Sequence, residues 1–185
     1  WLHEPLLEPP GYRLTLNQPR EQTGSDTGRR PSIPPDYLTF ADDASGLAFR
    51  YPPTWKVAAG SEPRSWRLAP RQTTGPAMHI ELKLVPRIEV PGSSAQKQLN
   101  LLEKFFSDQG ADIRKRGQME VAGKQVPYLV LLQPGSGGPE ARLQLVIPLP
   151  DHYLQAGYAG PQKHYPDALG IFENLLQSIT VSLKP

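Results

Sequence analysis

Two aspartates and two histidines in the C-terminal part of the chain have the side-chain chemistry of metal ligands. Asp151 and His152 precede one apolar segment of the sequence, and His164 and Asp167 follow it. Neutral imidazoles and carboxylates bind Zn²⁺ or Mn²⁺, and a segment that folds back would bring the two pairs together. These four residues are therefore the candidate divalent metal site, although polar surface loops use the same residue types. The sequence indicates no other cofactor.

One Ser-x-x-Lys pair, Ser94 to Lys97, has residue types that could serve nucleophilic catalysis. It lacks the Ser-Asp-Asn and Lys-Thr-Gly companions of catalytic pairs, so a helix cap at Ser94 explains it better. The run Gly-Ser-Gly-Gly at 135–138 lacks the lysine of a phosphate-binding loop, and we expect a flexible turn over 134–139. Because nucleophile, base and stabiliser roles are not filled together, we predict that the protein is not an enzyme.

Two short basic runs are candidates for a positive patch. Solvation of strand ends explains each run alone, whereas a patch that joined them would suit an acidic protein partner. Lys and Arg total 20 against 18 Asp and Glu, and no aromatic side chains can be placed on a face shared by the two runs, so we predict no nucleic-acid partner. The runs are Arg64, Arg67 and Arg71, and Arg114, Lys115 and Arg116.

The composition also bears on the compartment. The absence of Cys removes disulfides, thiolate catalysis and thiolate metal sites. No apolar run approaches the ~20 residues of a membrane span. The sequence opens on Trp1 rather than Met, which favours a processed protein whose signal peptide or lipid anchor preceded this residue. We therefore predict an extracytoplasmic protein, in the periplasm or the thylakoid lumen, while a trimmed cytosolic protein remains the alternative.

Residues 1–36 differ from the rest of the chain. They are rich in proline and have no periodic apolar face, so we predict an extended arm or tether before a domain over residues 37–185. The first part of the arm is more apolar than a linker requires. It is expected to dock on a protein partner, or to pack back on its own domain. The candidate partner-binding residues are Trp1, Leu2, Leu6, Leu7, Tyr12, Leu14 and Leu16.

The rest of the chain predicts the elements that would position such residues. Alternating apolar residues indicate short strands, and two segments have helical periodicity. In the first helix, a stripe of Leu99, Leu102 and Phe106 is expected to be buried, widened by Leu101 and Phe105. In the second helix, Pro166 occupies the first turn. The predicted strands are 38–41, 47–51, 55–58, 66–68, 78–85, 113–121, 125–133, 141–148, 153–158 and 179–183, and the helices are 94–109 and 166–179.

This order predicts an α+β fold in which an antiparallel β-sheet is sandwiched by helices. A corner at residues 46–57 is its most specific feature, because Pro52 and Pro53 end one strand and leave Trp55 as a bulky core anchor. A curved sheet of the cystatin-like or nuclear-transport-factor-like kind is the competing fold.

The motif Gly46-x-x-Phe49-x-Tyr51-Pro52-x-x-Trp55 resembles the opening signature of the PsbP-like superfamily. This superfamily includes the photosystem II extrinsic protein PsbP, the Ran-binding Mog proteins, and bacterial DcrB-type lipoproteins and effector chaperones. Later landmarks are similar in order. They are the amphipathic mid-chain helix, the hairpin entry Gly123-Lys124-Gln125-Val126, and the ending Phe172-x-x-Leu175-Leu176-x-Ser178-Ile179.

The resemblance implies a PsbP-like fold and a non-enzymatic accessory protein or assembly factor. Such a protein would bind and stabilise a larger, membrane-associated protein assembly, of which photosystem II is one example. Because members of one fold do different work, a chaperone or carrier that holds an apolar segment or a small ligand is the alternative. Its pocket would be lined from Leu99, Phe106 and the strand at 126–132.

Overall fold

The structure, a computed structural model, describes residues 33–72, 78–87, 94–121 and 124–182. Within these ranges the strands form two antiparallel sheets. The small sheet has the order β1-β2-β10, and the large sheet has the order β3-β4-β5-β9-β8-β7-β6. The strands are β1 (Leu38–Asp42), β2 (Leu47–Tyr51), β3 (Trp55–Ala59), β4 (Ser65–Pro70), β5 (His79–Pro86), β6 (Asp112–Val121), β7 (Lys124–Gly135), β8 (Gly138–Pro148), β9 (His152–Pro161) and β10 (Thr180–Val181).

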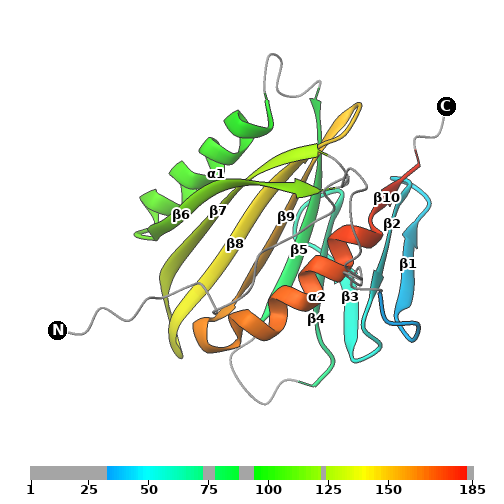
Figure 1. The fold of residues 1–185 in the computed structure, drawn as a ribbon, viewed down its shortest axis with the longest axis horizontal. Helices are drawn as coiled ribbons and strands as arrows, with labels where there is room; N and C mark the ends of the chain where they lie inside the picture. Colours follow the sequence, from blue (N-terminus) through cyan, green and yellow to red (C-terminus); the bar gives the residue numbers. More distant parts are fainter. Residues whose placement is uncertain (1–32, 73–77, 88–93, 122–123, 183–185) are drawn as a thin grey trace, which may run out of the picture.

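Two α-helices cover opposite faces of the large sheet (Figure 1). Helix α1 (Ala95–Asp108) packs over β6, β7 and β8. Helix α2 (Tyr165–Ser178) follows the short 3₁₀ helix η2 (Gln162–His164) and lies on the other face, next to β2 of the small sheet. The predicted α+β class, with an antiparallel sheet between helices, is confirmed. The division of the strands into two sheets was not predicted.

The alternation of side chains along the strands divides the core into two clusters. Val126 and Val130 of β7 lie in the larger cluster with α2 and the small sheet. Leu129 and Leu131 point the opposite way and pack in the smaller cluster with α1. The sequence predicted this split of β7 between two faces. Because both faces of β7 are covered by helices, the strand is apolar on both sides.

The Pro52-Pro53 corner carries the chain from the small sheet to the large one. Strand β2 ends at Tyr51 and β3 begins at Trp55, whose backbone N–H donates to the Pro52 carbonyl at 3.0 Å. The Trp55 side chain is only 3% exposed and lies in the larger cluster. The prediction that Trp55 anchors the core is therefore confirmed.

The glycine-rich run at 135–138 does not form the long flexible turn that the sequence predicted. Strands β7 and β8 stay paired through Pro134 opposite Pro139 and Gly135 opposite Gly138. Only two residues, Ser136 and Gly137, connect them. Gly138 has a φ of 115°, which L side chains rarely adopt, so its lack of a side chain lets the strands pair up to the turn.

The small sheet joins distant parts of the sequence. Thr180 of β10 pairs with Ala48 of β2, and the Ser182 backbone N–H donates to the Gly46 carbonyl at 2.9 Å. Gly46 has a φ of 72°, and a Cβ there would lie 2.0 Å from the Ser182 carbonyl oxygen. Only glycine therefore permits this turn and this approach together.

Candidate functional site

Helix α1 is held at both ends as its sequence predicts. The Ser94 side chain accepts a hydrogen bond from the Lys97 backbone N–H, which caps the first turn. At the other end, Gly110 has a φ of 84° and follows the last helical turn. The Ser-x-x-Lys pair is thus a helix cap. These ends fix which residues α1 presents to the large sheet.

The predicted apolar stripe of α1 is only partly correct. Leu99 and Phe106 are buried against the sheet, whereas Leu101 is 59% exposed and Phe105 is 55% exposed. The helix mainly contacts β6, β7 and β8 and leaves β4 and most of β5 uncovered on the same face. Leu101 and Phe105 lie on the flank of α1 that faces this uncovered part, so they do not widen the buried stripe.

A groove of about 710 Å³ lies between this flank of α1 and the connection between β3 and β4. Leu101, Leu102, Phe105 and Phe106 form its apolar wall, and the opposite wall is residues 59–62. Strands β4, β5, β8 and β9 provide the floor. The floor is polar, since it carries Arg67, Glu81, Lys83, Arg142, Gln144 and Gln155.

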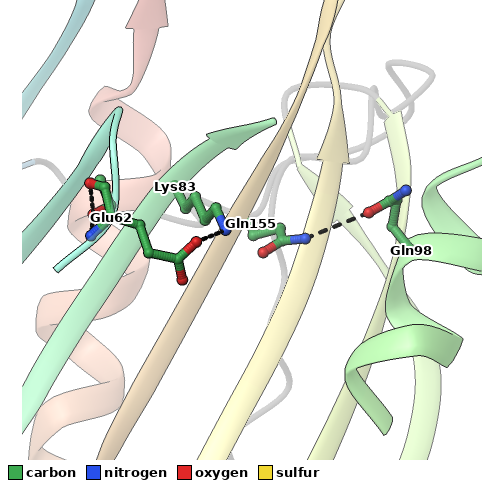
Figure 2. A network of polar contacts seen from close by, with 5 residues as sticks. Glu62, Lys83, Gln98 and Gln155 are labelled. Atoms are coloured by element: carbon green, nitrogen blue, oxygen red, sulfur yellow. Dashed lines mark hydrogen bonds and ion pairs between the residues drawn. The ribbon is translucent and has the colours of Figure 1, made fainter. Parts of the chain in front are cut away.

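Polar side chains cross the groove from one wall to the other (Figure 2). Lys83 bonds Glu62 on the wall opposite α1. Its cross-strand neighbour Gln155 donates through Nε2 to Oε1 of Gln98 on α1, at 3.5 Å. Gln98 is only 4% exposed. The groove therefore has a fixed polar floor beneath an apolar wall.

Most polar atoms of the charged groups in the floor bond one another, but Arg142 Nε is buried without a hydrogen-bond partner among the described residues. Arg67 Nη2 lies 3.0 Å from Nδ1 of His79, and Nε2 of the same ring lies 3.2 Å from Oε1 of Glu81. The hydrogen bond from His79 lowers the pKa of Glu81 below its ordinary value. Arg142 lies 3.1 Å from Glu140 and 5.3 Å from the centre of the Phe106 ring. A ligand in the groove would therefore meet little uncompensated charge.

A second, smaller hollow of about 240 Å³ adjoins the groove. Arg67 and Arg142 line both, and the smaller one is closed by His79, Glu140 and the turn at 135–139. Glu140 pairs with Arg142 here, and Arg67 lies against His79, whose ring bonds Glu81. This hollow therefore extends the groove without adding a strongly cationic site.

Gln144 differs from the other polar groups of the floor. It is 7% exposed and lines the groove, yet its carboxamide has no hydrogen-bond partner among the residues that the structure describes. Its cross-strand neighbour is Gly157, and a Cβ there would lie 2.3 Å from Gln144 Nε2. The missing side chain at Gly157 leaves the space that the Gln144 carboxamide occupies.

The metal site predicted at Asp151, His152, His164 and Asp167 is not formed. His152 begins β9 and His164 follows its end, so the ten-residue strand separates the two pairs by roughly 30 Å. His152 Nε2 instead lies 3.4 Å from Arg64 Nη1. Within the described ranges, no group of three or more His, Asp or Glu side chains is placed to hold a metal ion.

The two basic runs do not meet on one patch. They belong to β4 and β6, which are separated in the large sheet by four strands, or roughly 24 Å. Arg116 Nε bonds Glu103 of α1 at 2.9 Å, and Arg114 pairs with Asp112 at 2.8 Å. The runs are therefore tied to separate local partners.

The predicted partner-binding residues of the arm and the predicted ligand pocket have different outcomes. Trp1, Leu2, Leu6, Leu7, Tyr12, Leu14 and Leu16 lie outside the described residues. The packing of α1 fills the ligand pocket that was expected at Leu99 and the strand at 126–132. The observed groove lies along the other flank of the helix. Phe106 is the one residue that it shares with the predicted pocket. Sequence reasoning missed Gln144, Gln155 and Gly157. The available signal was a polar residue or glycine within an otherwise apolar strand.

No helix in the described ranges is long and apolar enough to span a membrane. No protein-family model matches the sequence, and no curated protein matches it. Similarity is found instead with solved structures. One of them, from Bacteroides thetaiotaomicron, gives a TM-score of 0.56 at 7% identity over 80% of this chain, which spans only 50% of that protein's length.

Three other solved structures match over most of their own length. Cyanobacterial PsbP (CyanoP) from Synechocystis sp. PCC 6803 is 14% identical with a TM-score of 0.58, over 86% of this chain and 98% of that one. The Ran-binding protein Mog1p of Saccharomyces cerevisiae is 9% identical with a TM-score of 0.54, over 78% and 95%. LpqN of Mycobacterium tuberculosis, involved in cell envelope biogenesis, is 11% identical with a TM-score of 0.52, over 80% and 92%. The chain therefore has the PsbP and Mog1p fold, as its sequence motifs predicted.

Proposed function

We propose that this chain is a non-enzymatic binding protein that holds a segment of a protein partner in the groove beside α1. The observation that carries the proposal is the exposure of Leu101 and Phe105 on one wall of that groove. Large apolar side chains that face a groove, rimmed by polar groups, are typical of interaction sites. The floor supports binding rather than reaction, because its charged groups already bond one another.

The solved structures with this fold support a binding role. Mog1p is a Ran-binding protein, and LpqN is involved in cell envelope biogenesis. In our proposal this chain is likewise an accessory protein, and it stabilises a larger membrane-associated assembly outside the cytoplasm, such as a photosystem. The apolar arm, including Trp1, Leu6 and Tyr12, would be a second contact with the same assembly.

The groove is tested by adding charge to its apolar wall. In Leu101→Asp and Phe105→Asp we expect the partner to be lost in co-purification from the source organism, because a carboxylate would be desolvated on binding. Both side chains are exposed, so the free energy of unfolding should change by only about 0.5 kcal/mol or less. Asn100→Asp is the matched control, since Asn100 is exposed on α1 but does not line the groove. Retention of the partner by both groove variants would refute the proposal.

The arm is tested by truncation. Deletion of residues 1–32 is preferable to a deletion through 36, because Arg50 Nη2 donates to the carbonyls of Pro34 and Pro35 at 3.3 and 3.2 Å. The shortened protein should melt like the full chain and bind the assembly more weakly. Unaltered co-purification would remove the arm from the proposed interface and leave the groove as the single contact.

A carrier of a small apolar ligand is the second candidate, and the volume of the groove favours it. Small-molecule sites commonly enclose roughly 300–1,000 Å³, a range that includes the 710 Å³ of this groove. Native mass spectrometry of protein purified from its source distinguishes the two candidates. A retained small molecule, lost in Leu101→Asp, would favour the carrier.

A further inference from the structure

The unpaired carboxamide of Gln144 carries information about what the groove binds. Neither its nitrogen nor its oxygen is among the fully buried side-chain atoms that lack a partner in the described residues, so both atoms remain accessible from the groove. The Gln144 residue is only 7% exposed and lines the groove. Its carboxamide has no hydrogen-bond partner among the described residues. Both its donor and its acceptor are therefore left for a molecule that enters the groove.

We infer that the groove binds an extended peptide segment of the partner, whose main-chain N–H and C=O bond the Gln144 carboxamide while an apolar side chain packs on Leu101 and Phe105. The inference rests on the proposed function and names the chemistry of its ligand. A carboxamide pairs with a peptide group in both directions, because each offers one N–H donor and one C=O acceptor side by side.

The charges of the floor favour this occupant over an ion. Lys83 bonds Glu62, Arg142 pairs with Glu140, and Glu81 is bonded by His79. A charged ligand would have to break one of these contacts, whereas an uncharged peptide group needs only what Gln144 leaves unpaired. The apolar wall, which Leu101 and Phe105 expose, supplies the burial that such a neutral ligand requires.

The same carboxamide favours an extended segment over a helix. The main-chain N–H and C=O groups within an α-helix are bonded to one another, so a helix presents none of them sideways to Gln144. An extended segment keeps these groups free, and its side chains alternate between two sides. One side would then meet α1, and the other would point away from it.

Gly157 shapes the place where the peptide group would lie. In the large sheet, Gly157 of β9 is the cross-strand neighbour of both Gln144 in β8 and Glu81 in β5. A Cβ at this position would lie 2.3 Å from Nε2 and 2.4 Å from Oε1 of Gln144. Gly157→Ala would therefore move the carboxamide from its present position, without a change in any charge.

The experiment uses the full chain and a library of random linear peptides. Selected peptides are titrated by calorimetry against the wild type, Gln144→Met, Gly157→Ala, Leu101→Asp and Asn100→Asp. We expect peptides with apolar residues to be recovered. Gln144→Met and Gly157→Ala should each weaken binding about tenfold, the loss of one net hydrogen bond. Asn100→Asp should bind like the wild type, and melting curves of all variants check that each remains folded.

A second readout addresses the main chain of the peptide directly. N-methylation at successive positions of a selected peptide removes one N–H at a time, and one position should show a loss of about tenfold that Gln144→Met no longer shows. This inference is overturned if no peptide is recovered, if a fluorescent fatty acid binds in place of peptides, or if Gln144→Met and Gly157→Ala bind peptides like the wild type. In each of these outcomes the proposed function still stands when Leu101→Asp or Phe105→Asp loses the partner in co-purification. It fails separately when both of these variants retain the partner.

Discussion

The two faces of the large sheet are built from the same strands and end up chemically opposite. The face toward α2 is closed by that helix and by the small sheet, and it buries Ile80, Leu82, Leu154 and Tyr158 without exposure above 1%. The face toward α1 is closed by that helix over β6 to β8 and over Tyr153 at the start of β9. Its remaining part carries the polar floor of the groove.

The difference shows how a sheet separates stability from binding. Successive residues of β5, such as Leu82 and Lys83, point to opposite faces, so one strand can serve both purposes. On the closed face, burial raises the pKa of Tyr158 from 10 to about 12, so its phenol stays protonated even in mildly alkaline solution. On the open face, polar side chains remain within reach of a ligand.

The largest expected effect tests the closed face. Trp55→Ala should lower the free energy of unfolding by about 3–5 kcal/mol, because it leaves a cavity in the larger cluster. This is a large part of a stability of ~5–15 kcal/mol. Chemical denaturation measures it, with Leu101→Ala on the open face as the control, expected within about 0.5 kcal/mol. Equal midpoints for the two variants would contradict the division of the faces.

A smaller effect tests whether the face toward α1 can loosen by itself. Ser94→Ala removes the N-cap of α1 and should cost about 1 kcal/mol. Amide hydrogen exchange should become faster in the first turn of α1 and remain unchanged in α2, because the two helices pack in different clusters. Ser107→Ala, at the exposed end of the same helix, is the control. Faster exchange in both helices would mean that the two clusters open together.

The smallest expected effects on stability come from two carboxyl groups, one on the open face of the large sheet and one on the helix that covers the closed face. The pKa of Glu81, in the groove, is lowered from its ordinary value of 4.5 by the hydrogen bond from His79. Glu81 therefore stabilises the fold above pH 4.5, and this contribution is lost as the pH falls through its lower folded pKa. The pKa of Glu173 on α2 is raised from 4.5 by burial. Glu173 therefore costs stability as the pH rises through its higher folded pKa.

Substitution by glutamine should separate the two groups. At neutral pH, Glu81→Gln should lower the free energy of unfolding and Glu173→Gln should raise it, each by less than about 1 kcal/mol because both side chains are partly solvated. Well below pH 4.5, both variants should approach the wild type. Urea denaturation across the acid range measures this, and shifts of the same sign would show that the two environments have been assigned wrongly.

The parts of the fold that follow from local patterns were predictable from the sequence. Two consecutive prolines at 52 and 53 offer no backbone N–H to a ladder and so end the strand, and the Ser94 cap depends only on the turn that follows it. Positions that depend on register were not predictable. Leu101 and Phe105 fit the helical stripe, but their exposure results from where α1 lies across the sheet. Gln144 becomes informative only because the pairing of β8 with β9 places it opposite Gly157. The metal prediction at His152 and His164 was wrong because the strand between them is extended.

The pairing of β10 with β2 has a consequence for folding during synthesis on the ribosome. Strand β2 is synthesised early, and residues 180–182, which complete its sheet and pack against Gly46, are synthesised late. Until they leave the ribosome, one edge of β2 has no partner from this sheet, and an unpaired edge is prone to association with other chains. The pairing of β10 with β2 therefore forms later than the β1-β2 pair, by a long-range closure. A nascent chain stalled before residue 180 would depend on chaperones to keep that edge covered.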